Sequence, residues 1–155
     1  MNTIAVFAIN KDLKLVIDDH FKDIRIQPLM QSVWTHLYRR SYAGPRRKLY
    51  AYFHEKRMEV FSFQQNRFRF SNSYEATNEH DALYYLLYIW KLIGMDVEKD
   101  ELYIVGDIPY QDWLIEKVKQ HLKFCRVINQ EVYFNNSQLA KRTEIPYDMK
   151  AIYLE

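Results

Sequence analysis

The sequence predicts an α/β fold with a mixed sheet, in which an antiparallel three-strand meander is continued by parallel strands with flanking helices. Three alternating segments follow one another between residues 49 and 70, with short polar turns between them. Two helical patterns then alternate with two short apolar strand patterns as far as residue 128. The length of 155 residues, 48% of them hydrophobic, suits one domain with a short appendage.

The first 47 residues are typical of a β-α-β-α segment that precedes this sheet. Ile4–Ile9 is a short apolar run, as expected of a buried strand, and Ile24–Ile26 alternates like a second strand. A helical pattern follows each of them. A Gly-Pro turn signal and a basic run at residues 41–47 then form the strongest composition break. We therefore expect two parts, residues 1–47 and residues 48–155.

The second part begins with the meander. Its strands are predicted at Leu49–His54, Met58–Phe63 and Arg67–Phe70. Polar turns at Glu55–Arg57 and Gln64–Asn66 separate them. Tight turns between alternating runs indicate antiparallel hairpins, so these three strands are expected to be neighbours in the sheet.

The remaining pattern alternates helix and strand. Asn78 can cap a helix that ends before Gly94, a residue type favoured just after a helix. Leu102–Val105 is a buried-type strand, Pro109 suits the first turn of a helix, and Cys125–Ile128 is the last strand. The resulting order, β-β-β-α-β-α-β, matches the ribonuclease H-like fold.

Several stretches also resemble an uncharacterised Bacteroidetes family, whose members look like degenerate relatives of actin-like ATPases, including the pilus-assembly type. The resemblance is carried by Lys48–Phe63, Phe70–Leu87, Leu102–Pro109 and Ile145–Asp148. It implies an actin-like subdomain. Actin-like proteins have two ribonuclease H-like halves, so residues 1–47 would be the remnant of a preceding half. A truncated gene, a fragment or a product that dimerises would each account for the missing part.

Composition excludes several classes of chemistry. The three glycines are far apart, so no glycine-rich phosphate loop of the P-loop or dinucleotide type is present. One cysteine, Cys125, excludes disulfides and cysteine-rich zinc sites and suits a reducing compartment. No apolar stretch approaches the roughly 20 residues of a membrane span, and no targeting signal is visible. We expect a cytoplasmic protein.

The positions where this fold would carry out chemistry lack the required residues. The turn Glu55–Arg57 holds neither glycine nor aspartate, and Gly106 is followed by Asp107 where the resemblance implies a paired glycine for adenosine. The first strand of the meander has no carboxylate. Asp107 together with Glu79 or Asp81 would therefore supply too few ligands for a two-metal site. We expect no enzyme activity, cofactor or metal, with a nucleotide-binding actin-like ATPase as the second alternative.

A nucleic-acid interface is the first alternative. Basic side chains cluster at the linker between the two parts: Arg39, Arg40, Arg46, Arg47 and Lys48. The strands that follow interleave arginine with Tyr50, Tyr52, Phe68 and Phe70, a pattern that suits stacking of single-stranded bases. The same pattern is typical of a core face with arginine on the other side. The net charge of only +2 is low for a dedicated nucleic-acid binder.

Surplus tyrosine favours a protein-interaction or scaffold module instead. Tyr84, Tyr85 and Tyr88 lie on one predicted helix, in a chain with 13 tyrosines. Tyrosine is common at interfaces because it combines a large apolar ring with a polar tip. We therefore expect a non-catalytic module whose interaction surface includes the basic linker and these tyrosines. Its partner would be another protein or a second copy of the chain.

Overall fold

A five-stranded sheet in the order β3-β2-β1-β4-β5 forms the centre of the chain in the computed structural model, which describes residues 3–42, 44–64 and 67–153. The strands are β1 (Lys48–His54), β2 (Arg57–Gln64), β3 (Arg67–Glu75), β4 (Glu101–Gly106) and β5 (Phe124–Val127). The first three pair antiparallel, whereas β4 pairs parallel to both β1 and β5. The predicted order and mixed sheet are confirmed. Gln65 and Asn66 of the second predicted turn, and Ala43 of the composition break, lie outside the described residues.

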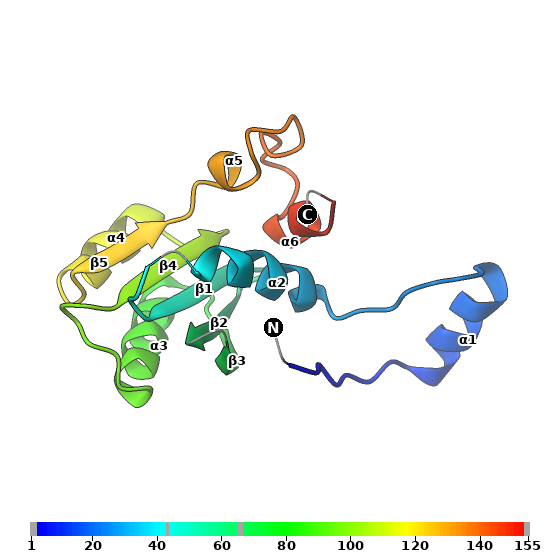
Figure 1. Cartoon of the computed structure of the whole chain (residues 1–155), viewed down its shortest axis with the longest axis horizontal. Coiled ribbons are helices and arrows are strands. Elements are labelled where there is room, and N and C mark those ends of the chain that lie inside the picture. Colours follow the sequence, from blue (N-terminus) through cyan, green and yellow to red (C-terminus); the bar gives the residue numbers. More distant parts are fainter. Residues whose placement is uncertain (1–2, 43, 65–66, 154–155) are drawn as a thin grey trace.

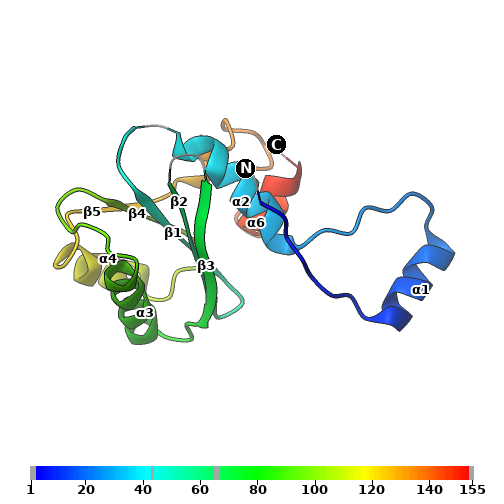
Figure 2. The same cartoon turned by 60° about the horizontal axis from the view of Figure 1, so that its bottom comes forward.

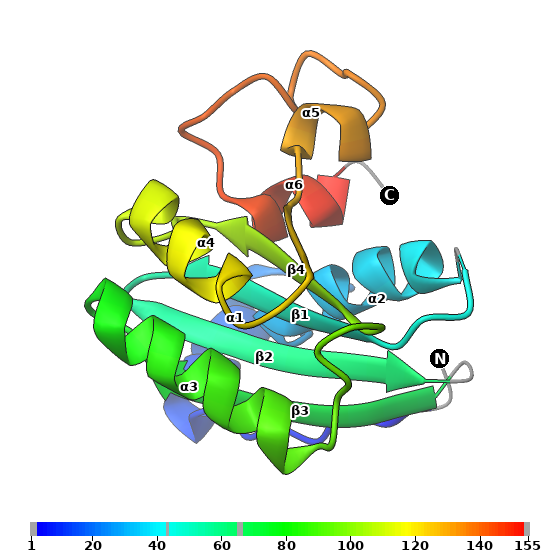
Figure 3. The same cartoon turned by 90° about the vertical axis from the view of Figure 1, so that its left-hand side faces the viewer.

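Helices cover both faces of this sheet (Figure 3). The helices of the described chain are α1 (Lys11–His20), α2 (Leu29–Ser41), α3 (Glu79–Leu92), α4 (Gln111–Lys119), α5 (Gln130–Tyr133) and α6 (Tyr147–Tyr153). α3 and α4 lie on one face, and α2 and α6 on the other. Within the described ranges, none of these helices is both long enough and apolar enough to cross a lipid bilayer.

The alternation of β1 divides the interior into two cores. Leu49, Ala51 and Phe53 pack toward α3 and α4, while Tyr50 and Tyr52 pack toward α2 and α6. All five side chains are buried. Burying a side chain of the size of leucine or phenylalanine contributes about 1.5–3 kcal/mol. The two cores together therefore fix the register of the central strand.

The ends of α3 agree with the sequence signals. The Asn78 side chain accepts a hydrogen bond from the Asp81 backbone N–H at 2.9 Å, which caps the helix. Gly94 follows the helix with a φ of +64°. The start of α4 is different: the helix begins at Gln111, so Pro109 precedes its cap residue, Tyr110, instead of occupying the first turn.

Strand β3 contains a bulge that the alternating pattern did not reveal. Phe63 of β2 pairs with Phe68, but the preceding residue, Ser62, pairs with Phe70, which leaves Arg69 as an extra residue. The bulge directs the two phenylalanines to opposite cores, Phe68 toward α2 and Phe70 toward α3. They do not form one continuous aromatic face.

The predicted strands at Ile4–Ile9 and Ile24–Ile26 are wrong, although both helices predicted among the first 47 residues are present. Neither segment is a strand in the structure. The apolar runs indicated a tendency to be buried, but a strand also needs backbone pairing with a neighbouring strand, and no strand of the described sheet pairs with them. Figures 1 and 2 show α1 held away from the sheet on two long extended legs. None of its ten residues is buried.

Candidate functional site

A cavity of about 500 Å³ lies at the carboxyl ends of β1 and β4. Open α/β sheets commonly bind their ligands at this end. Its lining comes from the β1–β2 hairpin, the end of β4 and the segment before α6: Tyr52, Phe53, His54, Glu55, Gly106, Asp107 and residues 143–148, with Gln130. The cavity therefore adjoins both the β1–β2 hairpin and Gly106, the two places where an actin-like ATPase would bind its nucleotide.

The β1–β2 hairpin turns on two residues with left-handed backbones. Glu55 has a φ of +46° and Lys56 a φ of +61°, as in the two-residue turns that favour Asn-Gly or Asp-Gly. A left-handed conformation costs an ordinary residue about 1–2 kcal/mol. Because both residues carry side chains, this turn lacks the bare backbone with which phosphate-binding loops approach their ligand.

Gly106 has a structural reason to be glycine. Its φ is +103°, and a Cβ at this position would lie 2.0 Å from the carbonyl oxygen of Phe53. The next backbone N–H, that of Asp107, donates to the same carbonyl at 2.9 Å. The end of β4 thus packs directly onto the end of β1. This close approach accounts for the glycine without any ligand.

Four carboxylates, one histidine and two tyrosines are among the side chains that line this cavity. Burial raises the pKa of Tyr52 above its usual range, and the neighbouring Asp148 carboxylate adds to this effect. The phenol is therefore neutral at physiological pH. In residues 3–42, 44–64 and 67–153, no group of three or more His, Cys, Asp or Glu side chains is arranged to hold a metal ion.

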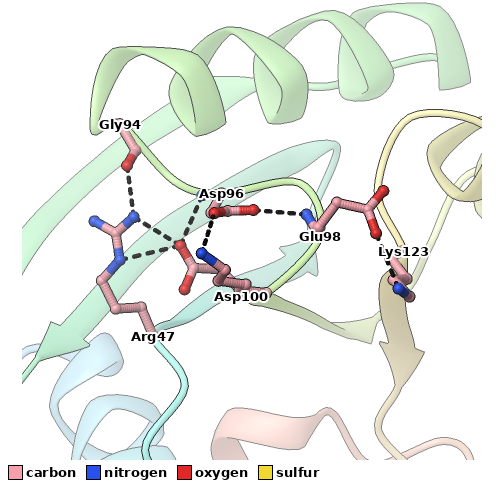
Figure 4. Close-up of polar contacts among 7 residues, drawn as sticks. Arg47, Gly94, Asp96, Glu98, Asp100 and Lys123 are labelled. Atoms are coloured by element: carbon pink, nitrogen blue, oxygen red, sulfur yellow. Dashed lines mark hydrogen bonds and ion pairs between the residues drawn. The ribbon is translucent and has the colours of Figure 1, made fainter.

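The basic linker is engaged in contacts within the chain. Arg47 donates from Nε and Nη2 to Oδ2 of Asp100, at 3.0 and 2.7 Å, and from Nη2 to the carbonyl oxygen of Gly94 at 2.5 Å (Figure 4). The same Asp100 oxygen accepts the backbone N–H of Asp96 at 2.8 Å. Asp100 is 5% exposed. Arg47 therefore neutralises a buried carboxylate.

Arg46 and Lys48 also have partners in the chain. Arg46 Nη1 lies 3.2 Å from Oε1 of Glu101, and its guanidinium lies 4.1 Å from the centre of the Phe124 ring. Lys48 is buried and donates from Nζ to the carbonyl oxygen of Ser41 at 2.9 Å. Burial lowers the pKa of Lys48, while Glu101 opposes this shift. These contacts hold the linker against the amino end of β4.

The two remaining predicted arginines lie on the last turn of α2. Arg40 donates to the backbone carbonyl of Tyr133, and its guanidinium lies 5.2 Å from the centre of that tyrosine ring. Arg39 is exposed. The five predicted basic residues thus lie on the linker and on the helix before it. At least four of them make hydrogen bonds or ion pairs within the chain.

The aromatic side chains of β1 are not available for stacking on bases. Tyr50 and Tyr52 are almost completely buried in the core beneath α2 and α6. Tyr50 stacks on Phe61 with 5.5 Å between ring centres. Tyr50, Tyr52 and Phe68 thus face one core, whereas Phe70 faces the other, so the interleaved aromatic residues pack inside the fold.

The tyrosines of α3 form an exposed stripe. Tyr84 and Tyr88 are 63% and 47% exposed, one helical turn apart, and their rings stack with 6.1 Å between centres and an interplanar angle of 8°. Leu92, one turn further, is also exposed. Tyr85 is half-buried and packs on Tyr74 of β3, with 4.6 Å between ring centres. We call Tyr84, Tyr88 and Leu92 the tyrosine face.

The carboxylates that bind the linker were not among the predicted site residues. Asp100 immediately precedes β4 and Glu101 is its first residue, while Arg46 and Arg47 immediately precede β1. The two strands are parallel neighbours, with Lys48 opposite Glu101. Parallel strands bring their amino ends to the same edge of the sheet, so the sequence did contain the signal for these ion pairs.

Comparison with known proteins shows the family and the fold of this chain. Residues 1–125 match the profile of a family described as "Protein of unknown function (DUF3822)". The chain belongs to this family. No curated protein matches it. A solved structure from Bacteroides thetaiotaomicron VPI-5482, described as a protein with actin-like ATPase fold and unknown function, is similar with a TM-score of 0.76 and 22% sequence identity.

That match covers 93% of this DUF3822 chain and 51% of the Bacteroides chain, so this chain spans about half the length of the solved one. At this identity the similarity shows the fold alone. The actin-like ATPase fold and the membership of an uncharacterised family are therefore confirmed. The division at residue 47 and the interpretation of the first segment as a remnant stay predictions.

One buried histidine makes the stability of the fold depend on pH. His36 of α2 is buried against the rings of Phe134 and Tyr147. Burial lowers its pKa to about 4, and the charges of Arg40 and Arg39 add to the shift. The unfolded chain, with an ordinary histidine pKa near 6.5, binds this proton more readily than the folded chain. Stability is therefore fully present above pH 6.5 and falls as the pH decreases toward 4.

Between pH 7 and pH 5, His36 is expected to lower the free energy of unfolding by about 1–2 kcal/mol. Urea unfolding at a series of pH values measures this loss. His36→Gln should flatten the dependence in this window, whereas His121→Gln, at an exposed histidine, should leave it unchanged. Equal slopes for the original chain and His36→Gln would contradict the assignment.

Proposed function

We propose that the chain is a non-catalytic, cytoplasmic module with the actin-like ATPase fold, which acts through protein contacts made by the tyrosine face of α3. The observation that carries this proposal is the stacked, exposed pair Tyr84 and Tyr88, with Leu92 continuing the stripe. Exposed tyrosine and leucine at successive turns provide apolar area together with hydroxyls that can bond to a partner.

The helix beneath this face makes it a rigid platform. On the other side of α3, Ala82, Leu86 and Ile89 are completely buried in the core shared with α4 and the sheet. The backbone that presents the tyrosines is therefore already ordered before any partner binds. Pre-ordered groups lose less conformational entropy on binding, which favours affinity from a small surface.

The alternatives have less support from the geometry. A nucleic-acid interface would need basic groups free to contact phosphates, but Arg46 and Arg47 bind Glu101 and Asp100. A nucleotide site would need a close approach of backbone to phosphate. At the corresponding cavity the hairpin turn carries side chains, and Gly106 is already in contact with Phe53.

Affinity capture from extracts of the organism that makes the chain tests the tyrosine face. The original chain is expected to retain a protein that Tyr84→Ser/Tyr88→Ser loses by at least about tenfold. The matched control is Tyr110→Ser/Tyr153→Ser, which removes two tyrosines that are even more exposed and lie elsewhere, and it should retain the partner. Equal capture by all three chains would contradict the proposal.

A thermal-shift measurement with ATP–Mg²⁺, ADP–Mg²⁺ and short oligonucleotides tests the alternatives. A ligand present at 100 times its dissociation constant adds about 2.7 kcal/mol of stability, which raises the Tm of a domain of this size by several degrees. We expect no such rise. A rise with ATP–Mg²⁺ would replace the proposal with nucleotide binding, and a rise with oligonucleotides would replace it with nucleic-acid binding.

A further inference from the structure

The first described residues form an apolar arm, and no residue between 3 and 27 is fully buried. We call residues 3–27 the arm. It holds nine of the 21 large hydrophobic side chains that are exposed in the described part of the chain. They are Ile4, Val6, Phe7, Leu13, Leu15, Val16, Phe21, Ile24 and Ile26. Such a concentration of exposed apolar side chains marks an interaction surface.

The helix within the arm is well specified but lacks a packing surface. Asn10 caps α1 by accepting the backbone N–H groups of Asp12 and Leu13, at 2.9 and 3.1 Å, and Lys14 pairs with Asp18. Yet no residue of α1 is buried. An isolated helix of ten residues is marginal in water, and most helices are stabilised by packing an apolar face. α1 therefore needs a partner surface.

A groove that could receive such an arm lies at its base. The groove has a volume of about 1,010 Å³. Its apolar lining comes from the start of the arm, from α2 and from β3: Ile4–Phe7, Leu29, Met30, Trp34 and Phe68. Figures 1 and 2 show that the extended legs hold α1 away from the α2 surface of its own chain. Residues 4–7 of the arm thus form one wall of this groove, whereas α1 lies away from it.

Charge argues for an apolar partner. The arm carries four basic and four acidic side chains and so has no net charge. An arm that bound an anionic membrane or a nucleic acid would need an excess of basic groups. A second copy of this chain offers what is needed: an apolar groove for the arm, and an arm for the vacant groove. In such a two-fold symmetric pair each contact occurs twice, and both arms and both grooves are occupied, so no third copy is added.

We propose that two copies of this chain pair by exchanging arms, so that residues 3–27 of one copy lie against the groove between α2 and β3 of the other. This interface is separate from the tyrosine face, so either proposal can fail while the other holds.

Sedimentation velocity over roughly 1–100 µM protein, a range that detects micromolar pairing, is the first test. The original chain is expected at twice its 18.9 kDa. Leu13→Glu/Val16→Glu, at two exposed side chains of α1, should weaken dimerisation by at least about 100-fold without changing the Tm of the monomer. Val97→Glu/Val132→Glu, exposed outside the arm, is the matched control and should dimerise normally.

Crosslinking of mixed copies is the second test. One copy carries Val16→Cys in α1, and a differently tagged copy carries Asn72→Cys beside the groove. A short bismaleimide should join the two tags, whereas Val16→Cys mixed with Val132→Cys should not be joined. The native thiol gives little background because Cys125 is buried and its pKa is raised to about 11.

Three results would overturn the proposal: a monomer at the highest concentration, a dimer that survives Leu13→Glu/Val16→Glu, or a dimer without the mixed crosslink. A dimer that is instead lost with Tyr84→Ser/Tyr88→Ser would assign self-association to the tyrosine face. The arm-exchange proposal would then fail while the proposed function stands.

Discussion

Gly106→Ala is expected to lower the free energy of unfolding by about 3–5 kcal/mol. Two costs combine. The φ of +103° is unfavourable for any residue with a side chain, and the new Cβ would lie 2.0 Å from the Phe53 carbonyl oxygen. Backbone atoms cannot move aside as the end of a flexible side chain can, so the ends of β4 and β1 must separate. The loss is measured by urea unfolding, followed by tryptophan fluorescence.

Gly94→Ala is the matched control. Gly94 also has a positive φ, +64°, but a Cβ there would meet no atom within 4 Å. Its cost should therefore be that of the left-handed conformation alone, about 1–2 kcal/mol. The difference between the two variants isolates the close contact of the strand ends. Equal losses would mean that β1 and β4 separate easily, and that the cavity beside Gly106 has more room than this packing allows.

Arg47→Met is expected to lower the free energy of unfolding by roughly 3–5 kcal/mol. The substitution keeps much of the apolar stem of the side chain but removes both hydrogen bonds to Asp100. It leaves that carboxylate buried with the backbone N–H of Asp96 as its remaining hydrogen-bond donor in this cluster. An unpaired buried charge is costly because it has lost its hydration without a compensating opposite charge.

Two further variants make this result specific. Arg142→Met removes a pair of similar length, 3.1 Å to Glu144, on an exposed part of the chain, and should cause no measurable change. Arg47→Met/Asp100→Leu removes both charges and should be less destabilised than Arg47→Met alone. If Arg47→Met were as stable as Arg142→Met, the linker arginine would not be neutralising a buried carboxylate.

This result also bears on how nucleic-acid binding should be tested. Replacing Arg46 and Arg47 would weaken the fold, so a loss of binding in such a variant would not identify a contact with phosphate. Arg67 and Arg69 on β3 are exposed and are the better positions. Their replacement should leave the Tm unchanged, and any effect on oligonucleotide binding could then be attributed to charge.

The part of the fold that the sequence predicted well is the part in which alternation and helix ends determine structure. On β2, Met58 and Val60 face one core while Phe61 and Phe63 face the other, as the period of two predicts. The bulge at Arg69 was not predicted. A single extra residue reverses the sheet face toward which the following side chains point, and it leaves no mark in the amino-acid composition. The short helices α5 and α6 were missed because too few residues define their periodicity.

The first segment shows the limit of the same reasoning. Apolar runs predicted burial for Ile4–Ile9 and Ile24–Ile26, yet all of these residues except the half-buried Ile9 are exposed. An apolar run in the sequence indicates that the segment tends to be buried, but it does not identify the surface against which the segment packs. For the linker, in contrast, the parallel pairing of β1 and β4 would have predicted the contact of the arginines with Asp100 and Glu101.

The bulge in β3 has a consequence for how copies of this chain can assemble. β3 is one edge of the sheet, and its outer backbone is a template for a further strand. The extra residue there is a charged one, Arg69, and the strand continues through the exposed polar residues Ser71 and Asn72. A kink and a charge at an open edge oppose the stacking of sheets side by side into fibres. Growth by edge-to-edge polymerisation is thereby disfavoured, and association is directed to surfaces that close on themselves.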